Sequence, residues 1–145
     1  MSGEADRLQL ALAAENASVY AYGVIGAWLT DDELSWARSA DLAHRRQRDA
    51  VSDLITAAGG TPTPAAPAYQ LPKPVTGRAE AVVLAVDVET RAAAVWRSAL
   101  GALTGNGREV ALDALVGAAV RAAQWRTAAG PGKSPIVPWP GGASS

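Results

Sequence analysis

Hydrophobic residues recur along this chain at alternating intervals of three and four, which is the spacing of one face of an α-helix packed in a bundle. Four stretches have this pattern, and they predict helices over residues 3–28, 31–58, 77–104 and 107–129. The period of two that is typical of β-strands does not compete with it. We therefore predict an all-α fold, with a four-helix bundle over residues 1–130 and a Pro- and Gly-rich tail over residues 131–145.

Residues that start and stop helices separate the four stretches. Thr30 followed by Glu33 is a capping box, which predicts the start of the second helix, and Gly59-Gly60 predicts its end. The sequence Gly105-Asn106-Gly107 separates the last two helices. We expect Asn106, with Glu109, to cap the fourth helix.

The lengths of the connections predict a topology. The first and second helices are joined by a few residues, as are the third and fourth, so each pair is expected to be an antiparallel hairpin. The second and third are joined by the 18 residues 59–76, which include five prolines. In extended form these span roughly 55 Å at about 3.1 Å per residue, more than the roughly 39 Å of a 26-residue helix.

This proline-rich segment is therefore long enough to cross the whole length of the bundle. The alternative is a flexible linker between two separate hairpins. We favour the crossover, because two isolated Ala-rich hairpins could not bury enough surface to be stable.

Four polar residues fall on the expected inward faces: Glu15, Asp41, His44 and Glu89. Burying a carboxylate costs several kcal/mol unless it is paired, hydrogen-bonded or bound to a metal. Some of the neighbours of these side chains must therefore be polar or charged. The fourth helix is expected to run through the apolar positions Leu112, Leu115, Val116, Ala119 and Ala123.

Two hairpins joined by one long crossover, with these polar residues inside, resemble the ferritin-like superfamily. More closely, the chain resembles an uncharacterised actinobacterial ferritin-like family, a domain of unknown function. The segments that carry this resemblance cover nearly the whole chain and are Ala14-Glu15-Asn16, Ala43-His44-Arg45-Arg46, Glu89 before Arg91, and Val137-Pro138-Trp139-Pro140-Gly141.

The ferritin-like resemblance implies a metal centre. In that superfamily a dinuclear iron site takes Glu from the first helix, E-x-x-H from the second, Glu from the third, and Glu with His or Gln from the fourth. The matching positions here are Glu15, Asp41 with His44, and Glu89. Iron or manganese is the cofactor that such oxygen-rich ligands with one His would suit. The fourth helix departs from the pattern, because it offers Arg121 and Gln124.

Three interpretations of this polar group remain open. Arg121, or Arg48, neutralises the carboxylates in a metal-free ion-pair network that includes His44; or one metal ion binds; or a dinuclear enzyme forms. The chain has a single His, and a guanidinium at position 121 would place a fixed positive charge where a second metal would lie. This count of ligands favours the metal-free network and leans against an enzyme.

Net charge, cysteine content and the absence of long apolar runs limit the kinds of binding partner and the cellular location that we expect. A net charge of −1 gives no electrostatic reason to expect nucleic acid or an anionic membrane as a partner. The chain has no cysteine, lacks an apolar run of membrane-spanning length, and begins without a signal-peptide pattern, so we expect a cytoplasmic protein.

Three classes of function are consistent with these features. The first is a non-catalytic structural or interaction module, which we expect to form a homodimer through an Ala-rich helix face. The second is an iron- or manganese-dependent oxidoreductase or binding protein. The third is a helical regulator that binds a small ligand between the helices, near Tyr22 and Trp96.

The tail contains the apolar residues Ile136, Val137 and Trp139 among prolines. Proline prevents a helix here, and these side chains are too apolar to favour full solvation. We expect Trp139 to pack on the bundle or on a partner subunit.

Overall fold

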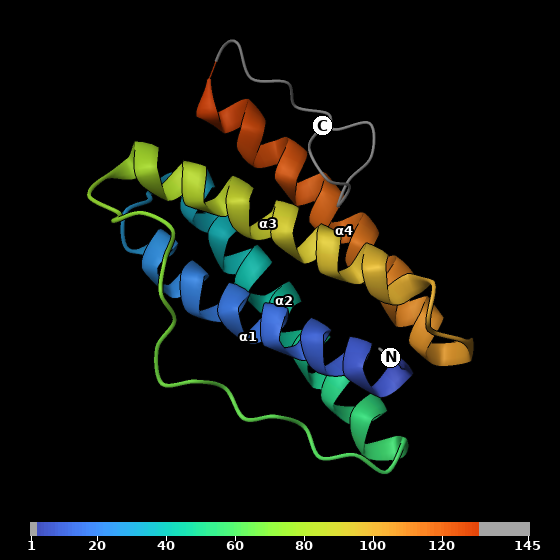
Figure 1. The fold of residues 1–145 in the computed structure, drawn as a ribbon. Helices are drawn as coiled ribbons and strands as arrows, with labels where there is room; N and C mark the ends of the chain where they lie inside the picture. Colours follow the sequence, from blue (N-terminus) through green and yellow to red (C-terminus); the bar gives the residue numbers. More distant parts are fainter. Residues whose placement is uncertain (1–2, 131–145) are drawn as a thin grey trace.

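The computed structural model describes residues 3–130, which form four α-helices and, within that range, no strands. The helices are α1 (Glu4–Gly26), α2 (Asp31–Ala57), α3 (Arg78–Leu100) and α4 (Gly105–Ala129). Figure 1 shows them packed lengthwise as a bundle. The predicted all-α bundle is therefore confirmed. Among these helices, none is both long enough and apolar enough to cross a membrane.

The helices pack as a four-sided arrangement. α1 packs against α2 and α3, α3 packs most extensively against α4, and α2 meets α4 over a smaller area. The two remaining pairs, α1 with α4 and α2 with α3, are diagonal: their backbones lie further apart, and they meet only through long side chains, such as those of Tyr22 and Trp125. Side chains at the middle of the bundle are therefore the ones that can touch all four helices.

The segment between α2 and α3 lies along α1 (Figure 1). Near the start of α1, the side chain of Gln9 donates to the carbonyl of Thr61 at 2.8 Å and accepts from the backbone N–H of Thr63 at 3.1 Å. Further along, the rings of Tyr69 and Tyr20 lie 5.6 Å apart. Leu71 and Val75, later in the segment, pack against the apolar core.

The two expected helix caps differ in outcome. Thr30 is the N-cap residue of α2, as predicted, but its side chain makes no capping hydrogen bond. The carboxylate of Glu33 instead accepts two hydrogen bonds from Arg78, at 2.8 and 2.6 Å, because a guanidinium competes well for a carboxylate. α4 begins at Gly105 with Thr104 as its N-cap, so Asn106 lies within the first turn.

The inward face of α4 also differs from the prediction. Leu112 and Val116 are 49% and 54% exposed, whereas the buried positions of this helix are mostly alanines. The small residues lie inside because α3 approaches α4 closely, and the larger aliphatic residues face outward. The buried residues of α4 are Gly107, Ala111, Ala114, Ala118, Ala122 and Trp125.

Close packing of alanines between α3 and α4 generates a prediction. Ala118 is 1% exposed and packs in a cluster with Ala92 and Ala93. We expect Ala118→Leu to lower the free energy of unfolding by about 1–3 kcal/mol, because there is no room for the extra carbons. Urea denaturation measures this change. The same substitution at the exposed Ala13 of α1 is the control and should change stability by less than about 0.5 kcal/mol. Equal effects at both positions would contradict the close packing.

Candidate polar centre

His44 lies at the middle of the bundle with no exposed surface, and both of its ring nitrogens face carboxylates. Nδ1 is 2.5 Å from Oε2 of Glu15, and Nε2 is 2.8 Å from Oε1 of Glu89. An ionised carboxylate only accepts hydrogen bonds, so each ring nitrogen has to donate one. With both glutamates ionised, the ring is a protonated imidazolium between two carboxylates, which come from α1 and α3.

Each of these two glutamates is held by further donors. Trp96 donates its indole N–H to Oε1 of Glu15 at 2.7 Å. Oε1 of Glu89 accepts from the Tyr22 hydroxyl at 2.6 Å and from Nε of Arg121 at 2.9 Å. A further indole, from α4, donates to the oxygen of Tyr22 at 3.0 Å. We refer to this connected group as the polar centre; its members are Glu15, Tyr22, His44, Glu89, Trp96, Arg121 and Trp125.

The polar centre links all four helices. α1 provides Glu15 and Tyr22, α2 provides His44, and the remaining four members come from α3 and α4 in pairs. Because α2 meets α4 over a small area, the path from His44 through Glu89 to Arg121 is a direct polar connection between them. The hydrogen bonds of the His44 imidazole therefore help to fix the positions of the four helices relative to one another.

The charges of the polar centre balance. Glu15 and Glu89 carry two negative charges, and the His44 imidazolium and the Arg121 guanidinium carry two positive ones. Buried charges are tolerated when they are paired and hydrogen-bonded. This balance explains how two fully buried carboxylates fit in an Ala-rich core.

The protonation states follow from the surroundings of each group. Burial alone would lower the pKa of His44, but the hydrogen bonds and negative charges of Glu15 and Glu89 raise it to about 9. Burial would raise the pKa of Glu89, but the hydrogen bond from His44 and the charges of His44 and Arg121 hold it below the ordinary 4.5. Burial and the charge of Glu89 raise the pKa of Tyr22 well above 10, so its hydroxyl stays a donor.

Of the residues singled out in the sequence, the structure brings together Glu15, His44, Glu89 and Arg121. The other three lie outside the polar centre. Asp41 is partly exposed and pairs with Arg45 one turn further along α2, at 3.1 Å. Arg48 pairs with its neighbour Asp49 at 3.0 Å, and Gln124 is exposed.

The expected inward position of Asp41 is wrong because its neighbour occupies that position. Ala37, Ala40 and His44 are the buried residues of this part of α2, at intervals of three and four. Asp41 is one residue beyond Ala40, which turns it by about 100° to the side of the helix. At the side of the helix its carboxylate is partly exposed and pairs with Arg45.

The roles of three aromatic residues in the polar centre were not predicted. A signal for them existed in the spacing: Tyr22 follows Glu15 by seven residues, and Trp96 follows Glu89 by seven. Seven residues are about two helical turns, so each aromatic lies on the same face as its glutamate. Buried Tyr and Trp need partners for their O–H and N–H groups, and here each donates to the glutamate of the facing helix, Tyr22 to Glu89 and Trp96 to Glu15.

The donor set of the polar centre does not fit the metal site that the ferritin-like resemblance implies. A His ligand binds a metal through a nitrogen lone pair, and here both nitrogens hydrogen-bond to carboxylates on opposite sides of the ring. Within residues 3–130, no three His, Asp or Glu side chains are arranged to hold one ion. Oε2 of Glu89 has no hydrogen-bond partner within the described residues, but this one oxygen is too few ligands to hold a metal ion.

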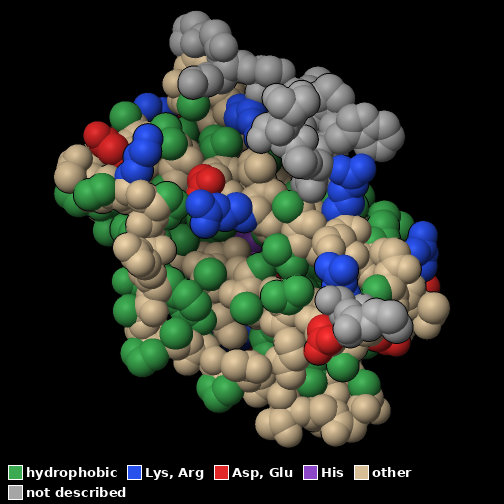
Figure 2. Space-filling view, in the orientation of Figure 1, with side chains coloured by type: hydrophobic (Ala, Val, Ile, Leu, Met, Phe, Trp, Pro, Cys, Tyr) green, Lys and Arg blue, Asp and Glu red, His purple; other side chains and the backbone are tan. Residues whose placement is uncertain are grey.

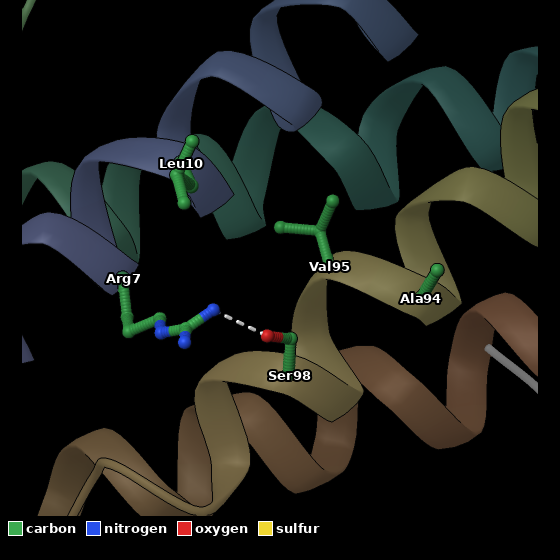
Figure 3. A pocket seen from close by; sticks show the side chains of 5 residues that line it. All are labelled: Arg7, Leu10, Ala94, Val95 and Ser98. Carbon is green, nitrogen blue, oxygen red and sulfur yellow. Dashed lines mark hydrogen bonds between the residues drawn. The ribbon is translucent and has the colours of Figure 1, made fainter. Parts of the chain in front are cut away.

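The surface has pockets away from the polar centre. A groove of about 300 Å³ lies between α1 and α3, and Tyr69 and Leu71 contribute to its lining. A smaller pocket adjoins it and shares Leu10 and Val95 with it. Figure 3 shows this second pocket, where Arg7 of α1 hydrogen-bonds to Ser98 of α3. None of the polar centre residues lines either pocket.

Comparison with known proteins identifies the family. Residues 7–144 match the family described as a domain of unknown function, DUF4439. This chain belongs to that family. The expectation of an uncharacterised family is confirmed, and the match includes the C-terminal tail, whose expected contacts lie outside the described residues.

One solved structure similar to the DUF4439 chain is the crystal structure of a conserved hypothetical protein, rv2844, from Mycobacterium tuberculosis. The two sequences are 36% identical, the TM-score is 0.85, and the similarity covers 88% of this chain and 91% of the mycobacterial one. A comparison with curated proteins finds no match.

The raised pKa of His44 generates a prediction about pH. A group with a higher pKa in the folded state stabilises the fold fully below its unfolded pKa, here 6.5, and this contribution is lost as the pH rises through about 9. We expect the free energy of unfolding to fall by on the order of 3 kcal/mol between about pH 6 and about pH 9.5, as measured by urea denaturation.

His44→Gln is the control variant for this pH dependence. It should be less stable than the natural protein near neutral pH and should lack most of the alkaline decline. A decline of the same size in His44→Gln would show that other groups cause it. The lowered pKa of Glu89 has the opposite sign, so its contribution is lost only as the pH falls below 4.5.

Proposed function

We propose that this chain is a ferritin-like bundle that acts as a non-catalytic structural or interaction module, with the polar centre as a buried ion-pair network. Two features support the ferritin-like assignment. The helices form two hairpins whose connecting segment lies along α1, and inward carboxylates from α1 and α3 meet a His from α2. In this proposal the polar centre holds the helices in place and carries out no reaction.

The observation that carries the proposal is the use of both ring nitrogens of His44. Each donates to a carboxylate, so the ring bridges α1 and α3 with its positive charge. The metal centre that the ferritin-like resemblance implies would use one of these nitrogens as a ligand. Binding iron or manganese would therefore require His44 to lose a proton from a position where its pKa is about 9.

An interaction role also needs a surface, and we place it on the groove between α1 and α3. Figure 2 looks onto this face and shows hydrophobic side chains with charged groups of both signs among them. Leu10 is 54% exposed at the groove, and Asp87 and Arg91, which pair with each other at 3.0 Å, also line it. Because these two charges neutralise each other, the apolar groove carries no charge that would repel an identical surface, and the occupant we propose is a second copy of this chain in a two-fold contact.

The ion-pair network predicts a large effect of removing the α4 cation. Arg121→Met would leave the polar centre with one unbalanced negative charge, and we expect the free energy of unfolding to fall by about 3–5 kcal/mol. Arg126→Met is the matched control on the same helix. It removes a hydrogen bond to Thr90 and should cost about 1 kcal/mol.

A double variant separates charge from packing. If the unbalanced charge causes the loss, Glu89→Gln should cost less in the Arg121→Met background than in the natural protein. Additive costs would contradict the network. The function itself is tested by elemental analysis of protein purified without a tag. Stoichiometric iron or manganese that disappears in His44→Ala would overturn the proposal in favour of a metal protein.

The proposed contact face predicts a change of oligomeric state. We expect the natural protein to sediment as a dimer at micromolar concentrations and Leu10→Glu to sediment as a monomer, because a charge is buried at the centre of the contact. Leu42→Glu is the matched control, since Leu42 is 47% exposed on α2, away from the groove. A natural protein that stays monomeric, or a dimer that Leu10→Glu leaves intact, would rule out this face.

A further inference from the structure

α4 carries a line of aliphatic side chains that no described residue covers. Leu112, Val116 and Val120 lie at successive intervals of four, so they form one stripe along the helix. They are 49%, 54% and 64% exposed. Isolated exposed aliphatic residues are common, but three in line on one face form a continuous apolar patch, here called the α4 stripe.

The α4 stripe is too small for a stable contact with a second protein. Three partly exposed aliphatic side chains offer on the order of a few hundred Å², against roughly 800 Å² per partner in a standard interface. A short peptide segment with one aromatic anchor fits better, since a single aromatic side chain buries about 150–250 Å².

The chain contains such a segment, because 15 residues follow Gly130 and include Ile136, Val137 and Trp139. The family match extends to residue 144, so these residues belong to the pattern that defines the family. Gly130 has a φ of +108°, which favours glycine, and Pro131 follows it. α4 therefore ends at Ala129, and proline at position 131 does not continue a helix.

The spacing of apolar residues along the tail matches the spacing along α4, when both are measured from Gly130. Val120, Val116 and Leu112 lie ten, fourteen and eighteen residues before Gly130, which is roughly 15, 21 and 27 Å along the helix. Ile136, Val137 and Trp139 lie six, seven and nine residues after it. A proline-rich extended chain places them roughly 19, 22 and 28 Å away at about 3.1 Å per residue.

We propose that residues 136–139 of the same chain pack on the α4 stripe, running antiparallel to the helix, with Trp139 near Leu112. The tail is then part of the domain, a strap that covers an apolar face which the other helices leave exposed. This proposal is independent of the function assigned to the polar centre, because it rests on the outward face of α4.

The absence of cysteine from the chain makes a disulfide test direct. Asp113 is exposed beside the α4 stripe, about 26 Å from Gly130 along the helix, and Pro138 can reach about the same distance in the tail. We expect the variant Asp113→Cys with Pro138→Cys to form an intramolecular disulfide on mild oxidation. The control is Ala13→Cys with Pro138→Cys, since Ala13 is exposed on α1, whose backbone lies diagonally opposite α4 in the bundle.

The first pair should close at least about tenfold faster than the control pair, at a rate independent of protein concentration. Adding Val116→Asp to the first pair should slow closure to the control rate. This exposed substitution leaves the core intact, so loss of folding does not explain the slowing. Equal rates for the two pairs, or no effect of Val116→Asp, would overturn the proposal. Disulfide-linked dimers alone would also overturn it and point to a second copy on the stripe.

Discussion

The rest of the structure depends on the protonated ring of His44 between Glu15 and Glu89. Each of the two hydrogen bonds joins α2 to a different helix, and the second carboxylate passes the connection on to Arg121 of α4. Apolar packing of alanines brings the helices close but leaves their rotation and sliding poorly defined, because small side chains interlock weakly. Directional bonds to one buried cation select a single arrangement.

Much of the fold could be predicted from the chain because three signals agree. Hydrophobic periodicity, glycine and proline at the ends of helices, and the lengths of the connections all point to four helices in two hairpins. The inward position of Glu15, His44 and Glu89 followed from the same periodicity. The errors arose where two neighbouring positions compete, as with Asp41 beside Ala40, and where alanine faces inward while Leu112 faces solvent.

The internal pairing of the polar centre could not be predicted in the same way. Periodicity places a residue on a face, but it does not say which atoms meet. Whether a His between two carboxylates binds a metal or keeps both protons depends on the side to which each oxygen lies, and on whether a guanidinium enters from the fourth helix. Those details depend on side-chain rotamers, which packing sets after the helices have come together.

The mutual dependence of the polar centre residues has a consequence for how relatives of this chain can diverge. Replacing one member leaves another with an unpaired charge or an unsatisfied hydrogen-bonding group. A single substitution therefore lowers stability, whereas a second substitution at the partner position can compensate for it. A lineage that loses the imidazole of His44 is expected to lose the carboxylates as well, and one that loses Arg121 to lose Glu89 with it. Between distant members of the family these positions should therefore be exchanged as a set, for instance for an entirely apolar middle layer.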